Sequence, residues 1–175
     1  MVFFISPPFG NYISLPNMKS ITGSYTLDKR EGLLMQIIKT FRYSFEYGGW
    51  INKIGLRNPG IDYAIKNYNK NDITSIAILK KEEIPKLLKK IPEDMDIEIN
   101  ISCPNTDEAP ISDGIKQFLN PKRKWCILKL SPLIKMAEIE SHYKNGFRQF
   151  HCSNTLPIEN RGGLSGSALI PYTSN

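Results

Sequence analysis

Cysteine is scarce in this sequence, and its spacing does not suit a structural framework. Three cysteines occur among 175 residues, and no two of them form a Cys-x-x-Cys pair. An odd number at such spacings argues against a disulfide framework and against a zinc site. We therefore expect Cys103, Cys126 and Cys152 to be free thiols in a reducing compartment, and we expect no bound metal.

Long apolar runs are also missing. No run approaches the roughly 18 apolar residues that are needed to span a bilayer. Residues 1–5 are too short and too uncharged for a signal peptide. These absences predict a cytoplasmic protein without a membrane association.

Acidic residues are outnumbered, since 17 Asp and Glu stand against 23 Lys and Arg and give a net charge of +6. Such an excess suggests an anionic partner. However, the lysines within residues 80–90 alternate with Glu82 and Glu83 in the pattern of the solvated face of one amphipathic helix. No nucleic-acid-binding motif accompanies the charge, so we expect no nucleic-acid surface.

The hydrophobic pattern predicts strands that alternate with helices, in units of roughly 25 to 30 residues. The length suits one domain over residues 1–175, and no internal repeat stands out. The predicted strands cover residues 18–26, 36–39, 73–79, 97–103, 126–130 and 147–155. The predicted helices cover residues 27–34, 61–68, 82–91, 112–119 and 133–144.

This alternation is typical of an α/β fold with a parallel sheet and right-handed crossovers. Polar residues recur where the predicted strands end, at Lys39, 100–105, 129–131 and 153–155, as on the catalytic rim of a barrel. We therefore predict a (β/α)8 TIM-barrel type of fold. The alternative is an open doubly wound sheet, which would normally carry its glycine-rich turn after the first strand. Here the glycine loop, Gly162–Gly166, comes last.

The stretch from residue 97 to residue 102 alternates isoleucine with polar residues, the period of a strand whose two faces meet different surroundings. Pro104 stops further ladder pairing, so Cys103 should lie where the strand ends. The structural alternative is a half-exposed edge strand followed by a turn. Cys103 itself is either an inert buried thiol or, if exposed, a general acid or base with an unperturbed pKa of about 8.5.

Lys129 lies in an otherwise apolar strand. A buried ammonium is costly unless an anionic or strongly polar group receives it. Lys129 therefore either reaches the surface, pairs with a neighbouring carboxylate, or serves as an electrophilic group beside a bound anion. Lys39 presents the same choice. The two histidines, His142 and His151, are expected to be structural.

Four asparagines also share a position at a predicted strand end or in an adjoining loop. They are Asn52, Asn100, Asn105 and Asn154. Singly, an asparagine there is a turn or capping residue. Converging amides would instead suit a flat heterocycle that presents N–H groups and carbonyls along its edges. Gly23, inside a predicted strand, marks a bulge or a close approach of a ligand or backbone. The loop 48–60 is too long and too rich in glycine for a mere connection.

Five motifs, taken together in their order and approximate spacing, resemble the dihydroorotate dehydrogenases. They are Ile51–Gly60 (INKIGLRNPG), Asn100–Asn105 (NISCPN), Leu128–Pro132 (LKLSP), Ser153–Thr155 (SNT) and Gly162–Gly166 (GGLSG). The resemblance implies a barrel that binds flavin mononucleotide (FMN) and oxidises dihydroorotate to orotate in pyrimidine biosynthesis. Cysteine in the NISCPN motif resembles the soluble class, since the quinone-using class has serine there and an amino-terminal extension.

The resemblance also implies roles for individual residues. Cys103 matches the base that removes a proton from dihydroorotate. The residues that match flavin contacts are Thr22, Gly23, Lys39, Thr40, Asn100, Lys129, Ser153 and Gly166. The residues that match contacts to dihydroorotate or orotate are Lys39, Asn52, Gly55, Leu56, Asn100, Asn105, Asn154 and Thr155. Besides this ligand, a homodimer is an expected partner. Fumarate and a second, nicotinamide-reading subunit both remain open as the route to the final electron acceptor.

The chain departs from the family in size. It offers about six strand-helix units, whereas a closed barrel needs eight and about 250 residues. We therefore expect an incomplete barrel, truncated at the carboxyl end and without the parts that usually build the phosphate site. One alternative is a truncated barrel without catalysis that acts as a binding or assembly partner. Others are the flavin domain of dihydropyrimidine dehydrogenase, against which the lack of iron-sulfur cysteine clusters argues, and tRNA-dihydrouridine synthase, against which the loop from Asn52 to Gly60 argues.

Overall fold

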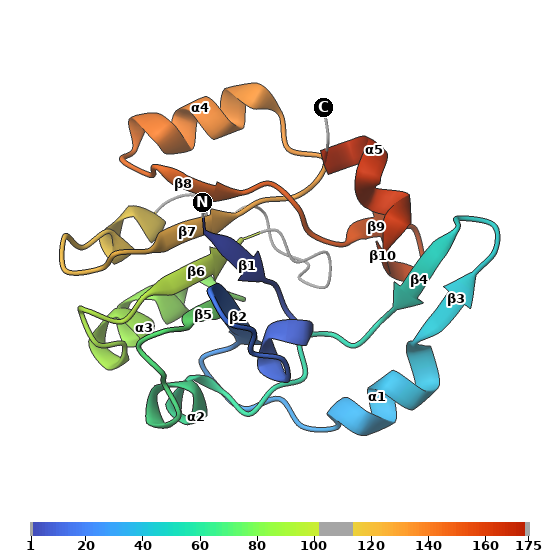
Figure 1. The fold of residues 1–175 in the computed structure, drawn as a ribbon, viewed down its shortest axis with the longest axis horizontal. Coiled ribbons are helices and arrows are strands. Elements are labelled where there is room, and N and C mark those ends of the chain that lie inside the picture. The colour runs from blue at the N-terminus through green and yellow to red at the C-terminus, as the bar shows by residue number, and fades with distance from the viewer. Residues whose placement is uncertain (1, 102–113, 174–175) are drawn as a thin grey trace.

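A computed structural model describes residues 2–101 and 114–173 of the chain. Its main element is a six-stranded parallel sheet with the strand order β1-β2-β5-β6-β7-β8. Helices connect the strands, and the sheet curls into an incomplete (β/α)8 barrel, as predicted (Figure 1). The strands are β1 (Phe3–Ile5), β2 (Met18–Tyr25), β5 (Ile73–Ala77), β6 (Ile97–Asn100), β7 (Cys126–Lys129) and β8 (Gln149–His151).

A second, four-stranded antiparallel sheet has the order β3-β4-β10-β9. Its strands are β3 (Arg42–Ser44), β4 (Gly49–Asn52), β9 (Leu156–Ile158) and β10 (Gly162–Ser165). Both glycine-rich loops of the sequence therefore contribute strands here, and β4 and β10 pair directly. Ile51, Leu156 and Leu164 form a small core of their own beneath this sheet.

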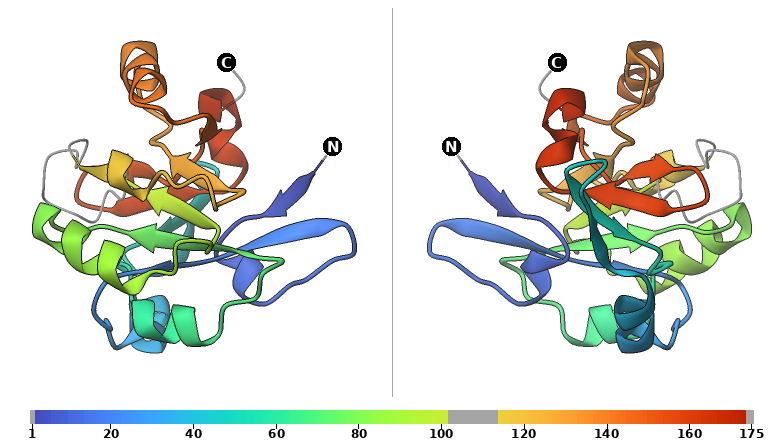
Figure 2. Two further views of the ribbon diagram at one scale, coloured as in Figure 1. Left: turned by 90° about the vertical axis from the view of Figure 1, so that its left-hand side faces the viewer. Right: turned by 90° about the vertical axis from the view of Figure 1, so that its right-hand side faces the viewer.

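Helices α2 (Ile61–Lys66), α3 (Ile84–Lys90) and α4 (Met136–Lys144) lie around one side of the parallel sheet, whereas α1 (Leu33–Thr40) lies beside the antiparallel sheet (Figure 1). The chain ends in α5 (Ile170–Thr173). Short 3-10 helices complete the list: η1 (Phe9–Asn11), η2 (Lys81–Glu83), η3 (Ile115–Phe118) and η4 (Ser167–Leu169). Figure 2 shows β1 at the margin of the molecule.

The two faces of the parallel sheet bury different side chains. On the helix side, Ile97, Ile99 and Leu128 join the main core, which the helices complete with residues such as Leu87 and Phe118. On the opposite side, a smaller cluster holds Ile21, Ile73 and Ile127, with Phe4 and Trp125 packed against it. Strand β6 is buried along its whole length, so the alternative of a half-exposed edge strand at this position is wrong.

The predicted order of elements fails between residues 27 and 40. The sequence predicted a helix over 27–34 and a strand over 36–39, but the structure has one helix, α1, over Leu33–Thr40. Most residues of this segment are straight-chain helix formers, and Gly32, with a φ of 87°, begins the helix. As a result β2 pairs directly with β5, and the sixth parallel strand is β1 from the amino-terminal segment.

The other predicted elements are present with shorter bounds, whereas the strands of the antiparallel sheet, β3, β4, β9 and β10, were not predicted. The helix predicted over 82–91 is η2 followed by α3, and the helix predicted over 112–119 is only the 3-10 turn η3 within the described residues. The strand predicted over 147–155 ends at His151. Helix α4 is followed by Asn145 and Gly146, as predicted.

Candidate functional site

The carboxyl ends of β6, β7 and β8 bring three polar side chains into one row. Asn100, Lys129 and His151 are Cα partners across the three strands. Neighbours in register on parallel strands project to the same side of the sheet, which here is the side opposite the main core. Asn100 and Lys129 are 5% and 7% exposed. These strand ends do gather polar groups, as the sequence predicted.

Two of the four asparagines are in direct contact. Asn154 Nδ2 donates a hydrogen bond to Asn100 Oδ1 at 2.9 Å, and Asn154 Oδ1 accepts one from the backbone N–H of Thr155 at 2.9 Å. Thr155 lies against the second sheet, because a Cβ built on Gly163 would be 2.8 Å from its Oγ1. Gly163 is in turn the register partner of Asn52. The segment after β8 therefore joins the amide pair to the strand that carries Asn52.

The hydrogen bonds continue from Asn100 into the sheet. Asn100 Nδ2 donates to Ser24 Oγ at 3.1 Å, and the hydroxyl oxygens of Ser24 and Ser75 are 2.8 Å apart. Ser75 Oγ donates to Glu98 Oε1 at 2.7 Å. The second carboxylate oxygen of Glu98, Oε2, is 2.7 Å from His151 Nδ1. Glu98 is fully buried, and each of its oxygens has a partner.

Glu98 is ionised at neutral pH. Burial raises the pKa of its carboxyl group, but the hydrogen bond with His151, the positive charge of Lys129 and the hydrogen bond from Ser75 outweigh burial. The net pKa of Glu98 is lowered from its ordinary value. Lys129 therefore does not reach the surface. It is buried within electrostatic reach of a carboxylate, which agrees with the paired alternative.

Gly23 lies where β2 departs from regular pairing. The register between β2 and β5 shifts between Thr22 and Tyr25, and Gly23 has a φ of 113°. A Cβ on Gly23 would lie 2.5 Å from the backbone oxygen of Ser75. The predicted bulge and close approach are both confirmed, and the approaching backbone belongs to β5.

The loop after β4 holds the remaining predicted substrate residues. Asn52 Oδ1 accepts a hydrogen bond from the backbone N–H of Ile54 at 3.3 Å, and both Gly55 and Leu56 have positive φ, 68° and 54°. Thr40 Oγ1 accepts a hydrogen bond from the backbone N–H of Lys53 at 3.0 Å. Thr40 therefore fixes this loop to the end of α1.

Lys39 is not at a strand end. It lies in the last turn of α1 and is exposed, so the structure does not bring it to the row of Asn100 and Lys129. The reason is the helical conformation of residues 33–40. The sequence-based placement of Lys39 on the rim is wrong in this respect.

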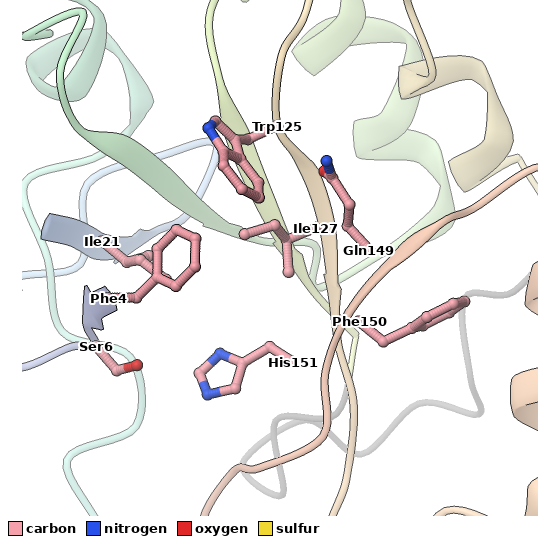
Figure 3. Close-up of a pocket in the computed structure, with 8 residues that line it drawn as sticks. All are labelled: Phe4, Ser6, Ile21, Trp125, Ile127, Gln149, Phe150 and His151. Atoms are coloured by element: carbon pink, nitrogen blue, oxygen red, sulfur yellow. The ribbon is translucent and has the colours of Figure 1, made fainter. Parts of the chain in front are cut away.

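A cavity of about 280 Å³ lies on the side of the parallel sheet away from the main core. Figure 3 shows Phe4, Ile21 and Ile127 around it, with the His151 ring directed toward the same space and Phe150 directed away. Its lining residues are Phe4, Ser6, Ile21, Trp125, Ile127, Gln149, Phe150 and His151. The cavity is mainly apolar, and His151 lies between it and Glu98.

The described residues contain neither a membrane-spanning helix nor a metal site. No helix within 2–101 or 114–173 is long and apolar enough to cross a membrane. The same residues contain no group of three or more His, Cys, Asp or Glu side chains that could hold a metal ion. Cys126 and Cys152 are free thiols, as predicted, and burial raises the pKa of Cys126 to about 11.

Curated relatives align with this chain over most of its length. Dihydroorotate dehydrogenase B (NAD(+)), catalytic subunit, from Petrotoga mobilis is 35% identical over 158 positions, 78% of this chain and 50% of that protein. The protein of the same name from Caldicellulosiruptor saccharolyticus is 37% identical over 182 positions, 86% of this chain and 59% of its own length. The one from Bacteroides thetaiotaomicron is 29% identical over 201 positions, 93% and 64%. No protein-family model matches the chain.

The chain belongs to the dihydroorotate dehydrogenase family. It spans about half the length of the curated relatives that it matches. The similarity agrees with the five motifs and with the incomplete barrel.

The residues of this chain that could hold a flavin are Lys129, Asn100 and Gly166. Lys129 and Asn100 are adjacent in the sheet and supply a cation and an amide. Gly166 has a φ of 100°, and among the described residues only Trp50 Cδ1 lies near its missing Cβ, at 3.8 Å, so a ligand could approach its backbone. This donor set fits the polar edge of a flavin. Gly23 is a weaker match, because the β5 backbone already explains the absence of a side chain there.

Two matched residues lie outside the described part of the chain, and a third lies between two strands. Cys103 and Asn105 lie outside the described residues. Ser153 lies in the segment between β8 and β9 and is half-buried. The roles that the resemblance implies for these residues remain predictions.

Sequence reasoning missed the partners of the amide pair, namely Ser24, Ser75, Glu98 and His151. The sequence pattern predicts a structural role for the two histidines. It marks Glu98 only as one of the polar residues of an alternating strand. One signal was available: a glutamate inside a strand that is expected to be buried needs an internal partner. The identity of that partner depends on sheet register, which the sequence did not provide.

Proposed function

We propose that this protein is the catalytic chain of a dihydroorotate dehydrogenase, oxidising dihydroorotate to orotate with bound FMN in the pyrimidine biosynthesis of the cytoplasm. The observation that carries the proposal is the contact of Asn100 with Asn154 in the row that contains Lys129. A buried cation beside two amides matches a ligand that is both anionic and rich in amide groups.

The residues divide the work as follows. FMN, when bound, supplies the acceptor for a hydride. Lys129 would hold the pyrimidine end of the flavin, where negative charge gathers on reduction, so that its ammonium stabilises developing charge. Asn154 and Thr155, with Asn100, would hold the substrate through amide and hydroxyl hydrogen bonds.

Cys103 would take the proton from dihydroorotate, a role that rests on the family resemblance. A thiol has an ordinary pKa of about 8.5, so modest tuning makes it a base at neutral pH. Asn52, Gly55 and Leu56, on the loop that Thr40 fixes, would close over the substrate, and Asn105 would add a further amide.

We further propose NAD+ as the final electron acceptor. The relatives carry NAD(+) and the words "catalytic subunit" in their names, and a catalytic subunit implies a partner subunit. Together with the expected homodimer, this gives an assembly in which the present chain supplies the dihydroorotate site.

The test begins with the flavin. Residues 1–175 are purified with added FMN, and absorbance near about 450 nm, where oxidised flavins absorb, is followed across the gel-filtration peak. We expect flavin in a compact peak, and oxidation of dihydroorotate under a chosen electron acceptor. Cys103→Ala should keep the flavin and lose roughly 100-fold or more of the rate, the usual contribution of general base catalysis. An equal rate in Cys103→Ala would contradict the assigned base.

A binding or assembly role without catalysis is the second candidate. It is favoured by the apolar cavity beside the open sheet, since unpaired strand edges and uncovered apolar surface invite another chain. A colourless protein that self-associates with increasing concentration would support this role over the enzymatic one.

A further inference from the structure

One continuous series of hydrogen bonds crosses the parallel sheet, and we call it the Glu98 chain. It draws residues from β2, β5, β6 and β8 and from the segment after β8. Its members, in order, are Asn154, Asn100, Ser24, Ser75, Glu98 and His151. The donor-acceptor distances between neighbours run from 2.7 to 3.1 Å.

The Glu98 chain has a fixed direction. An ionised carboxylate can only accept hydrogen bonds, so Ser75 must donate its single hydroxyl proton to Glu98. Ser24 must then donate to Ser75, because the Ser75 hydroxyl has no second proton. Ser24 is left as an acceptor for Asn100, which must turn its nitrogen toward the serine.

The same logic orients the second amide. With Asn100 Nδ2 committed to Ser24, its Oδ1 faces Asn154 and accepts from Asn154 Nδ2. Asn154 Oδ1 is then the atom that accepts the backbone N–H of Thr155. Every group in the series donates toward Glu98. The orientation of Asn100 follows from one negative charge that does not touch it, and Asn154 is oriented in the same sense by Asn100 and by the backbone N–H of Thr155.

His151 completes the series from the other side. Because Glu98 Oε2 can only accept, His151 must carry its proton on Nδ1. The His151 side chain is 22% exposed, whereas that of Glu98 is 0% exposed. Lys129, in register with His151 on the neighbouring strand, adds the positive charge that keeps Glu98 ionised.

We propose that Glu98 is a positioning residue, which sets the orientation of the Asn100 and Asn154 amides through the hydroxyls of Ser75 and Ser24. An amide presents a donor at one end and an acceptor at the other. The orientation of each amide therefore decides whether it offers a donor or an acceptor to a given group of the ligand. This inference rests on the proposed function only for the identity of that ligand, a pyrimidine carboxylate.

The decisive variant is Ser75→Ala, which interrupts the series and leaves the contact of Glu98 with His151 in place. Ser24→Ala interrupts it one link later and keeps the hydrogen bond of Ser75 to Glu98, so it serves if Ser75→Ala does not fold. Ser20→Ala is the matched control. Ser20 lies on β2, is 4% exposed and donates to the Ile13 carbonyl at 2.9 Å, outside the series.

Two readouts are measured on the full chain with added FMN. The first is the dissociation constant of orotate, which we expect to rise about fivefold in Ser75→Ala and Ser24→Ala and to change less than twofold in Ser20→Ala. The second uses ¹⁵N NMR. The unsubstituted chain should show His151 protonated on Nδ1 and one sharp pair of Asn100 side-chain N–H signals. Those Asn100 signals should broaden or double in both chain variants.

The two hypotheses fail in different ways. If the unsubstituted chain binds no orotate, the proposed function fails, and the NMR signals alone decide the inference about Glu98. If His151 carries its proton on Nε2, or if Ser75→Ala and Ser24→Ala match Ser20→Ala in both readouts, the positioning role of Glu98 is overturned. A fivefold loss of affinity with unchanged Asn100 signals would overturn it too, since orientation would not be the cause.

Discussion

At the scale of single residues, His142 shows how an unpaired nitrogen affects stability. His142 is 6% exposed on α4, and its Nδ1 has no hydrogen-bond partner among the described residues. Burial lowers its pKa, and Glu138 only partly opposes that shift. A buried polar atom without a partner costs about 1 to 3 kcal/mol.

The lowered pKa of His142 predicts a pH dependence of stability. The unfolded chain takes up a proton near pH 6.5 while the folded chain resists it. Stability is therefore complete above about pH 6.5 and falls as pH drops toward the folded pKa. His142→Leu should raise the free energy of unfolding by about 1 kcal/mol at pH 5.5 and flatten the slope between pH 7.5 and 5.5. Urea unfolding at the two pH values measures both, and an unchanged slope would refute the explanation.

Gly23 and Gly32 provide a matched pair for testing close approach. Both have positive φ, 113° and 87°, so alanine is strained at either position by about 1 kcal/mol or more. At Gly23 the added Cβ would also collide with the Ser75 backbone, whereas at Gly32 no atom of the described residues lies within 4 Å. Gly23→Ala should therefore lower the free energy of unfolding by roughly 3 kcal/mol in total. This loss includes the backbone strain that Gly32→Ala shares and exceeds it because of the collision. Equal losses in denaturant unfolding would show that conformation alone requires the glycine.

At the scale of elements, α1 is the strongest departure from the sequence-based prediction. Its apolar side chains are largely uncovered, with Leu34 71% exposed and Ile38 69% exposed. A barrel strand at this position would bury such side chains. In the structure no residue of α1 is buried.

A single substitution separates the two conformations of this segment. Ile38→Lys should change the free energy of unfolding by less than about 0.5 kcal/mol, as exposed positions usually do. Leu87→Ala, on the fully buried face of α3, should cost about 2 to 5 kcal/mol. Chemical denaturation of the two variants gives the comparison. A loss of several kcal/mol from Ile38→Lys would favour the strand that the sequence predicted.

Local pattern explains both the success and the failure at this scale. The alternation over residues 97–100 predicted β6 correctly, because isoleucines face one side of that strand and polar side chains face the other. Residues 33–40 hold apolar residues in runs rather than in strict alternation, and such runs do not separate helix from strand. Only pairing with a neighbour decides between the two, and β2 pairs with β5 instead.

At the scale of the whole molecule, β1 and the residue before β7 meet across the cavity. The rings of Phe4 and Trp125 are 5.1 Å apart at 83°, although β1 is a terminal strand of the sheet and β7 is far along its order. Edge-to-face rings of this kind add to the energy of burial. The contact ties the first strand to the distant part of the sheet.

The neighbouring residues Phe3 and Phe4 allow the contribution of this contact to stability to be measured. Phe4→Ala should cost about 2 kcal/mol, somewhat less than a fully buried phenylalanine, because Phe4 is only half-buried. Phe3→Ala is the control, since Phe3 is 57% exposed on the same strand and should change stability by less than about 0.5 kcal/mol. Urea unfolding followed by the fluorescence of the two tryptophans, Trp50 and Trp125, reports both. Similar values for the two variants would mean that β1 contributes nothing through Phe4.

The fold class and the gathering of polar residues at the strand ends were predictable, because motif order and strand ends carry that information, whereas the contact of Asn100 with Asn154 was only one of two alternatives. The series that fixes those amides was not predictable. It joins Ser24 to Asn100 across β5 and Glu98 to His151 across β7, so a shift of one residue in register would break these links. Residues of the site can be read along the chain, whereas their partners depend on the assembled sheet.

The Glu98 chain has a consequence for how the protein folds. Its hydrogen bonds join residues that are 23, 51, 53, 54 and 76 positions apart. Contacts of such separation form slowly, because the intervening chain loses its freedom before any bond repays the loss. The site is therefore incomplete on the ribosome: until β8 and the segment after it have emerged and joined the sheet, Glu98 lacks its histidine and Asn100 lacks Asn154.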